Sequence, residues 1–135
     1  MGLVQNVRDY LAADATLMAL LPGGLYAGGE ITRQLTPAAF DANGELSPCG
    51  LVNATSDTPD GPTLYAGRML VSVWLYHRTR DAANETAVAR IKTLLHRQVL
   101  PGTYEVRWAF DTSGFEDDAL AARAAVTRYE VIRKL

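Results

Sequence analysis

The stretch of sequence that decides the fold is residues 68–77, Arg68-Met69-Leu70-Val71-Ser72-Val73-Trp74-Leu75-Tyr76-His77. It is rich in β-branched and aromatic residues, which favour strands, and its side chains alternate between two faces. One face is wholly apolar and consists of Met69, Val71, Val73 and Leu75. The other face also carries large apolar side chains, Leu70, Trp74 and Tyr76, and is too apolar for simple solvent exposure. We therefore predict a strand with one face in the core and the other against a second layer or another subunit.

A helix is predicted after this strand, over residues 81–99. Its apolar residues recur at helical spacing: Ala87, Val88, Ile91, Leu94, Leu95 and Val99. Thr79 or Asp81 can cap the start of this helix, and Pro101-Gly102 can end it.

Two strands are predicted after the helix. Residues 103–110 alternate, which places Tyr104, Val106, Trp108 and Phe110 inward. Residues 111–118 read as an acidic connection, and a last strand follows from about Ala124, with Thr127, Tyr129 and Val131 on one face. The fold class is therefore α+β: an antiparallel or mixed β-sheet of about four strands, with one long helix packed across a face.

The first part of the chain predicts a short helical region, a long loop and one more strand. The helical start covers residues 3–21: apolar side chains recur every three or four positions from Leu3 to Leu11, and Asp14 can cap a second helical piece that Pro22-Gly23-Gly24 ends. Residues 22–48 are predicted to be mostly loop, either a mobile surface loop or an arm that reaches a neighbouring subunit. Residues 49–55 form a short strand, and a turn follows over residues 57–62.

Size and composition set limits on the function. A chain of 135 residues fits one domain, residues 1–135, with a real hydrophobic core. The net charge of −2 disfavours a nucleic-acid binder, because such domains carry a basic face. Cys49 is the only cysteine, which excludes an internal disulfide and favours synthesis in a reducing cytoplasm. The start lacks the pattern of a signal peptide, and no apolar run approaches the roughly 20 residues of a membrane span.

No group of residues in the sequence is arranged for chemistry. His77 and His96 stand on different elements, and neither has a second His or Cys at metal-ligand spacing. The glycines of residues 23–29 match neither a dinucleotide fingerprint nor a P-loop, and Glu116-Asp117-Asp118 lacks the spacing of a calcium loop. We predict a protein that is not an enzyme, without a catalytic site, a metal site or a cofactor.

Two stretches carry a family resemblance. They are residues 14–26, Asp14-Ala15-Thr16-Leu17-Met18-Ala19-Leu20-Leu21-Pro22-Gly23-Gly24-Leu25-Tyr26, and residues 69–76, Met69-Leu70-Val71-Ser72-Val73-Trp74-Leu75-Tyr76, which lead into a helix. With the helix ending in Leu94-Leu95-His96 and the two closing strands, the chain resembles the small tail-terminator, or tail-completion, proteins of long-tailed bacteriophages and their prophage relatives. The resemblance covers nearly the whole chain.

This resemblance implies a structural protein of the virion tail or neck, assembled in the host cytoplasm. Such proteins form a homo-oligomeric ring, typically a hexamer, that caps the tail tube, ends its polymerisation and joins the tail to the head-side connector. The implied partners are further copies of the chain, the tail-tube protein and a head-side connector or stopper protein. DNA passes through the lumen without sequence-specific binding, and no membrane is involved.

The candidate contacts with neighbouring subunits or with the tube come from three places. They are the second face of the central strand, the turn before it and the long loop, with the residues Leu70, Trp74, Tyr76, Asp57, Asp60, Tyr65, Ile31 and Arg33. Two other functions stay open. One is a head-to-tail adaptor or stopper of the phage neck, and the other is a small-molecule-binding or enzymatic α+β domain.

Overall fold

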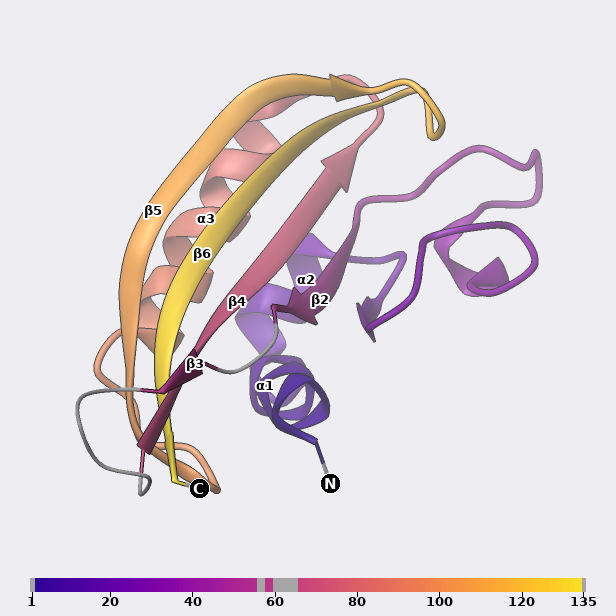
Figure 1. The fold of residues 1–135 in the computed structure, drawn as a ribbon. Helices are drawn as coiled ribbons and strands as arrows, with labels where there is room; N and C mark the ends of the chain where they lie inside the picture. Colours follow the sequence, from indigo (N-terminus) through magenta and orange to yellow (C-terminus); the bar gives the residue numbers. More distant parts are fainter. Residues whose placement is uncertain (1, 56–57, 60–65, 135) are drawn as a thin grey trace.

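The computed structural model describes residues 2–55, 58–59 and 66–134. In this part of the chain the helices are α1 (Leu3–Ala12), α2 (Ala15–Leu20) and α3 (Asp81–Leu95), with a 3-10 helix at Pro37–Ala39 (Figure 1). The strands are β1 (Leu25–Ala27), β2 (Cys49–Ala54), β3 (Thr58–Pro59), β4 (Ala66–His77), β5 (Thr103–Asp117) and β6 (Ala122–Lys134).

The strands form one mixed sheet. Its order is β1-β2-β4-β6-β5, and β3 pairs with β4 beside this path. The β1–β2 pair is parallel, whereas the other pairs are antiparallel. The prediction of an α+β fold with a mixed sheet is confirmed. The predicted number of about four strands is too low, since the described residues form six, and β1 and β3 are too short to leave an alternating pattern.

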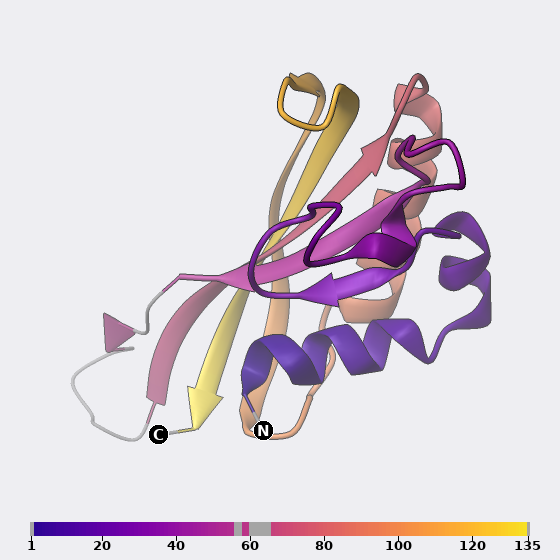
Figure 2. The same cartoon turned by 90° about the vertical axis from the view of Figure 1, so that its right-hand side faces the viewer.

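The three helices pack on one face of the sheet (Figures 1 and 2). The predicted inner face of β4 is confirmed, because Val71, Val73 and Leu75 are fully buried there. From the helices, the buried residues of this core are Leu3, Val7, Leu11, Leu17, Ala87, Val88, Ile91 and Leu95. At about 25 cal/mol per Å² of apolar surface removed from water, such a cluster supplies most of the driving force for folding.

The opposite face of the sheet is covered only in part. Residues 28–48 fold back toward β2 and β4, so that Ile31, Ala39 and Leu46 are buried in a second cluster. From the sheet, this cluster contains Cys49, Leu51, Tyr76, Ala122 and Ala124. The second layer predicted over the far face of β4 is therefore supplied, at this end of the sheet, by the chain's own long segment.

Strand β5 differs from its prediction in the orientation of its side chains and in its length. Of the four residues predicted to point inward, only Val106 is buried, with 1% of its surface exposed, whereas Tyr104, Trp108 and Phe110 are 50%, 40% and 45% exposed. The pairing of β5 with β6 shifts register at three places, and two of these shifts, at Thr103/Glu105 and Trp108/Phe110, interrupt the alternation of residues 103–110. The strand also continues to Asp117, through the residues predicted to be a connection.

The boundaries of α3 differ from those predicted. Neither Thr79 nor Asp81 caps this helix; its N-cap position is Arg80, without a side-chain cap. The helix ends at Leu95, before the predicted Val99, and Arg97 has a positive φ of 65°. This turn lets the Arg97 N–H donate to the Val106 carbonyl at 2.7 Å, which covers part of the outer edge of β5.

Candidate interaction surfaces

The residues that the sequence predicted for an interface differ in their exposure in the structure. Tyr76 and Ile31 are 6% and 5% exposed, so they lie inside the second cluster rather than on the surface. Leu70 and Trp74 are partly buried, and Arg33 is exposed. The remaining candidates, Asp57, Asp60 and Tyr65, lie outside the described residues.

The far face of β4, β6 and β5, opposite α3, is named here the open face, and Arg128 lies at its centre. The guanidinium carbon of Arg128 is 5.5 Å from the ring centre of Trp74 and 5.3 Å from that of Phe110. Its Nε is buried and has no hydrogen-bond partner among the described residues. The two rings hold the guanidinium of Arg128 in place, although a buried donor without an acceptor costs free energy.

Trp74 is held by the chain on two sides. Its indole N–H donates to Asn53 Oδ1 at 3.2 Å, and its ring meets Phe115 edge-on at 6.2 Å between ring centres. These contacts fix the orientation of Trp74 while part of its surface stays open to solvent. The side chain is therefore preorganised, which lowers the entropy lost on binding.

A second surface follows β5, and we name it the aromatic edge: Tyr104, Trp108 and Phe110. Each of these exposed rings has a cation beside it. The cations are Lys134 at 5.4 Å from the Tyr104 ring centre, Lys92 at 4.2 Å from Trp108, and Arg128 at 5.3 Å from Phe110. The pattern of the sequence pointed the three rings inward. The register shift between Trp108 and Phe110 turns Phe110 to the open face, whereas Trp108 stays on the helical side, beside Lys92 of α3.

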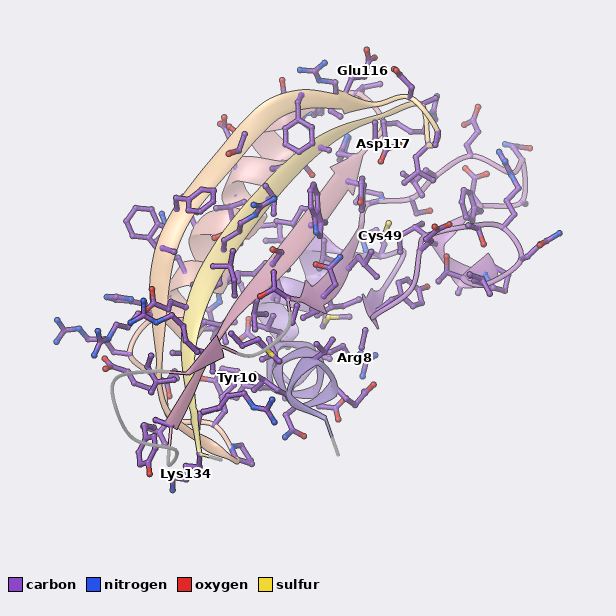
Figure 3. The ribbon with its side chains drawn as sticks, in the orientation of Figure 1. Arg8, Tyr10, Cys49, Glu116, Asp117 and Lys134 are labelled. Carbon is purple, nitrogen blue, oxygen red and sulfur yellow. The ribbon has the colours of Figure 1, made fainter. Side chains whose placement is uncertain are left out.

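A groove lies on the other side of the molecule, between residues 29–35 and the β5–β6 hairpin at residues 117–120. We name it the hairpin groove; its volume is about 730 Å³. Its apolar lining consists of Ile31, Leu35, Phe40, Leu51, Tyr76, Ala119 and Leu120. Glu30 and Asp117 add carboxylates to the lining. Figure 3 shows Glu116 and Asp117 at this end of the sheet and Lys134 at the opposite end.

The histidines and the cysteine take structural positions. His77 Nδ1 accepts the N–H groups of Thr79 and Arg80 at 3.2 and 3.0 Å, and burial together with Arg80 and Arg78 lowers the pKa of His77. His96 Nδ1 accepts the N–H of Trp108 at 3.0 Å. Burial raises the pKa of the Cys49 thiol to about 12.

Neither metal ligands nor membrane-spanning helices stand out in the part of the chain that the structure describes. Within residues 2–55, 58–59 and 66–134, no group of three or more His, Cys, Asp or Glu side chains could hold a metal ion. In the same residues, no helix has the length and apolar character needed to cross a membrane.

Comparison with protein-family models and with curated proteins gives no match for the sequence. Among solved structures, the chain is similar to a chain from the virion of a native gene transfer agent (GTA) particle, with a TM-score of 0.66 and 15% sequence identity. The likeness covers 98% of this chain and 95% of that chain. Identity this low carries over the fold rather than individual site residues. Over nearly its whole length, the protein thus shares the α+β fold of a component of the gene transfer agent virion.

Proposed function

We propose that this protein is a structural subunit of a phage-like virion, and within it the tail-terminator ring that caps the tail tube and joins it to the head-side connector. The observation that carries the proposal is the fold likeness to a gene transfer agent virion chain, which extends over both chains nearly end to end. The resemblance of residues 14–26 and 69–76 to tail terminators gives the more specific role.

The surfaces of the protein are compatible with this role. A ring is built from a head-to-tail contact, which requires two different surfaces on each subunit. The open face and aromatic edge present partly exposed aromatic rings, and the hairpin groove offers a separate apolar surface. Aromatic residues and Arg are enriched at protein interfaces, whereas Lys and Glu are depleted.

The test is assembly in the presence of tail-tube protein. We expect the purified protein to form a ring, measured by light scattering and seen by negative-stain imaging, either alone or on tube ends. Added to polymerising tube protein, it should shorten the tubes in proportion to its concentration, because each ring closes one growing end. Tubes of unchanged length, with no protein at their ends, would contradict the terminator role.

The same experiment separates a terminator from a head-to-tail adaptor or stopper. An adaptor binds the portal-side protein and leaves tube length unchanged. Binding to portal-side protein without any effect on tubes would assign the chain to the neck. If the protein stays monomeric and binds neither component, the proposed role as a virion subunit is wrong.

A further inference from the structure

We infer that the contact between neighbouring subunits runs from the aromatic edge of one copy to the hairpin groove of the next. This inference rests on the proposed ring, and it adds which two surfaces meet and which side chains join them. Phe110 of one copy enters the groove beside Leu35 of its neighbour.

The aromatic edge has the composition of an interface centre. Scattered exposed apolar residues are normal, but here three large rings lie along one edge strand, each 40% to 50% exposed. Phe110 lies on the open face beside Arg128, and Trp108 lies on the helical side of the same edge, beside Lys92 of α3. Arg128, beside Phe110, has a buried Nε without a hydrogen-bond partner among the described residues. Aromatic residues and Arg supply most of the energetically dominant contacts in protein interfaces.

The hairpin groove provides a matching surface. Leu35 is 68% exposed on its wall, and Ile31, Phe40 and Leu120 line it further inside. Arg33 also borders the groove, but its guanidinium donates to the Gly44 carbonyl at 2.7 Å and 3.2 Å and lies 5.0 Å from the Phe40 ring centre. The cation is thus engaged within the segment, while the exposed Glu30 remains to meet a positive partner.

The positions of the two surfaces favour a head-to-tail contact. In Figure 1, β5 is at one side of the molecule and residues 28–48 are at the other, in agreement with the strand order β1-β2-β4-β6-β5. Arg128 accompanies Phe110 at the aromatic edge, and Glu30 and Asp117 line the groove. Opposite charges therefore meet when the edge of one copy faces the groove of the next.

Two other occupants of the aromatic edge fit less well. A second aromatic edge, in a two-fold dimer, would leave the groove of each copy empty and would close the assembly at two subunits rather than build a ring. A nucleic acid would meet carboxylates as well as cations, since Lys92 pairs with Asp111 at 2.7 Å and Arg107 pairs with Glu105 at 2.9 Å. The chain as a whole also carries a net charge of −2, which disfavours phosphate, so a second copy of this chain is the better partner.

The test uses one variant for each surface, Phe110→Ser for the edge and Leu35→Ser for the groove. Both side chains are exposed in the single chain, so the thermal unfolding temperature should stay near that of the wild type. Each variant alone should need about a tenfold or higher concentration to assemble. Phe110→Tyr, which keeps a ring at this position, should assemble like the wild type.

Mixing the two variants gives the decisive result. The intact edge of Leu35→Ser can dock into the intact groove of Phe110→Ser, and the two surfaces left over are both defective. We therefore expect heterodimers that grow no further, measured by native mass spectrometry. An edge-to-edge contact would instead leave Leu35→Ser dimeric by itself, and this outcome would overturn the inference.

Cross-linking tests the contact even when the assembly is weak. In an equal mixture, Phe110→Cys and Leu35→Cys should join through a short bismaleimide in clear excess over Phe110→Cys mixed with Thr93→Cys, which lies on the exposed side of α3. Rings that persist in both serine variants would overturn this inference but leave the proposed ring intact. A wild type that is monomeric, with or without tube protein, and shows no such excess would overturn both.

Discussion

Asp14 joins parts of the helical layer that are far apart in the sequence. Its Oδ2 accepts the N–H of Leu17 at 2.8 Å, as the sequence predicted for a helix cap. The same carboxylate accepts Nε and Nη2 of Arg90 at 2.9 and 2.7 Å, which ties α2 to α3. The Arg90 side chain, with the Leu17 N–H, holds the pKa of Asp14 below its ordinary value.

The lowered pKa of Asp14 predicts a pH-dependent stability. Because the folded state favours the carboxylate, this group stabilises the fold above its ordinary pKa of 3.8, and the stabilisation is lost as the pH falls through the lower folded-state pKa. Asp14→Asn keeps a capping side chain but loses the charge. It should lower the unfolding temperature at neutral pH, and the difference from the wild type should narrow below pH 3.8.

Asp9→Asn is the matched control for this measurement. Asp9 pairs with Arg8 at 3.1 Å on the exposed side of α1, where ion pairs contribute little. A difference between Asp14→Asn and the wild type that stays constant down to the lowest pH would show that the charge of Asp14 does not act through Arg90.

Cys49 should be unreactive in the folded protein. Its side chain has no exposed surface, and burial raises its pKa to about 12, so the nucleophilic thiolate is scarce at mildly alkaline pH. A thiol reagent should modify the native protein slowly and the urea-unfolded protein rapidly, as measured by mass spectrometry. Rapid native labelling would mean that residues 28–48 open frequently, because Cys49 packs in the cluster that they cover.

At the scale of the element, one face of β4 is buried at one end of the strand and partly exposed further along it. Trp74 and Tyr76 are separated by one residue and point to the same side of the sheet, yet Tyr76 is 6% exposed and Trp74 is only partly buried. The difference arises because residues 28–48 cover one end of this face, where Tyr76 lies among Ile31, Ala39 and Leu46. The alternation of the strand cannot reveal where that cover ends.

This difference in burial predicts that alanine at Tyr76 mainly weakens folding and that alanine at Trp74 mainly weakens subunit association. Tyr76→Ala should cost about 3 kcal/mol of the free energy of unfolding, because it empties a buried site. Trp74→Ala should cost about 1 to 2 kcal/mol and weaken subunit association more than folding. Chemical unfolding measures the first effect, and light scattering on the folded fraction measures the second. Unchanged association with a collapse of stability in Trp74→Ala would make Trp74 a core residue.

Strand β5 shows where an alternating pattern fails. The sequence of residues 103–110 alternates as well as that of β4, but β5 is at the end of the sheet and pairs with one strand, β6. A central strand is held in register from both sides, whereas an edge strand can take in an extra residue and turn its side chains. Edge position is a property of the whole sheet, so the exposure of Trp108 and Phe110 could not be predicted from their spacing.

At the scale of the whole molecule, the sheet carries two hydrophobic clusters of unequal size. The helical face has the larger one, with residues from all three helices and from β1, β2, β4, β5 and β6. The second cluster depends on residues 28–48, which have little regular structure of their own beyond the 3-10 helix and an isolated bridge between Phe40 and Leu46. We expect this segment to open at lower free energy than the helical core.

Two adjacent alanines test the independence of the second cluster. Ala39 has no exposed surface, whereas Ala38 is exposed, so Ala39→Asp buries a charge and Ala38→Asp does not. Ala39→Asp should destabilise residues 28–48 by on the order of 2 kcal/mol, seen as faster hydrogen exchange at the Ser47 N–H, which donates to the Ala39 carbonyl. Amides of β4 and β6 should stay protected. Equal acceleration across the whole sheet would mean that the two clusters unfold as one.

The sequence by itself determined the type of most elements and the faces of the central ones. Helical spacing identified α1 and α3, alternation identified β4 and β6, and Asp14 marked the start of α2, because these signals arise between residues close along the chain. Only the tertiary structure decided which surfaces stay open. The exposure of the β5 rings, the cover over Tyr76 and the groove beside Leu35 depend on contacts between residues distant in sequence, which no local period records.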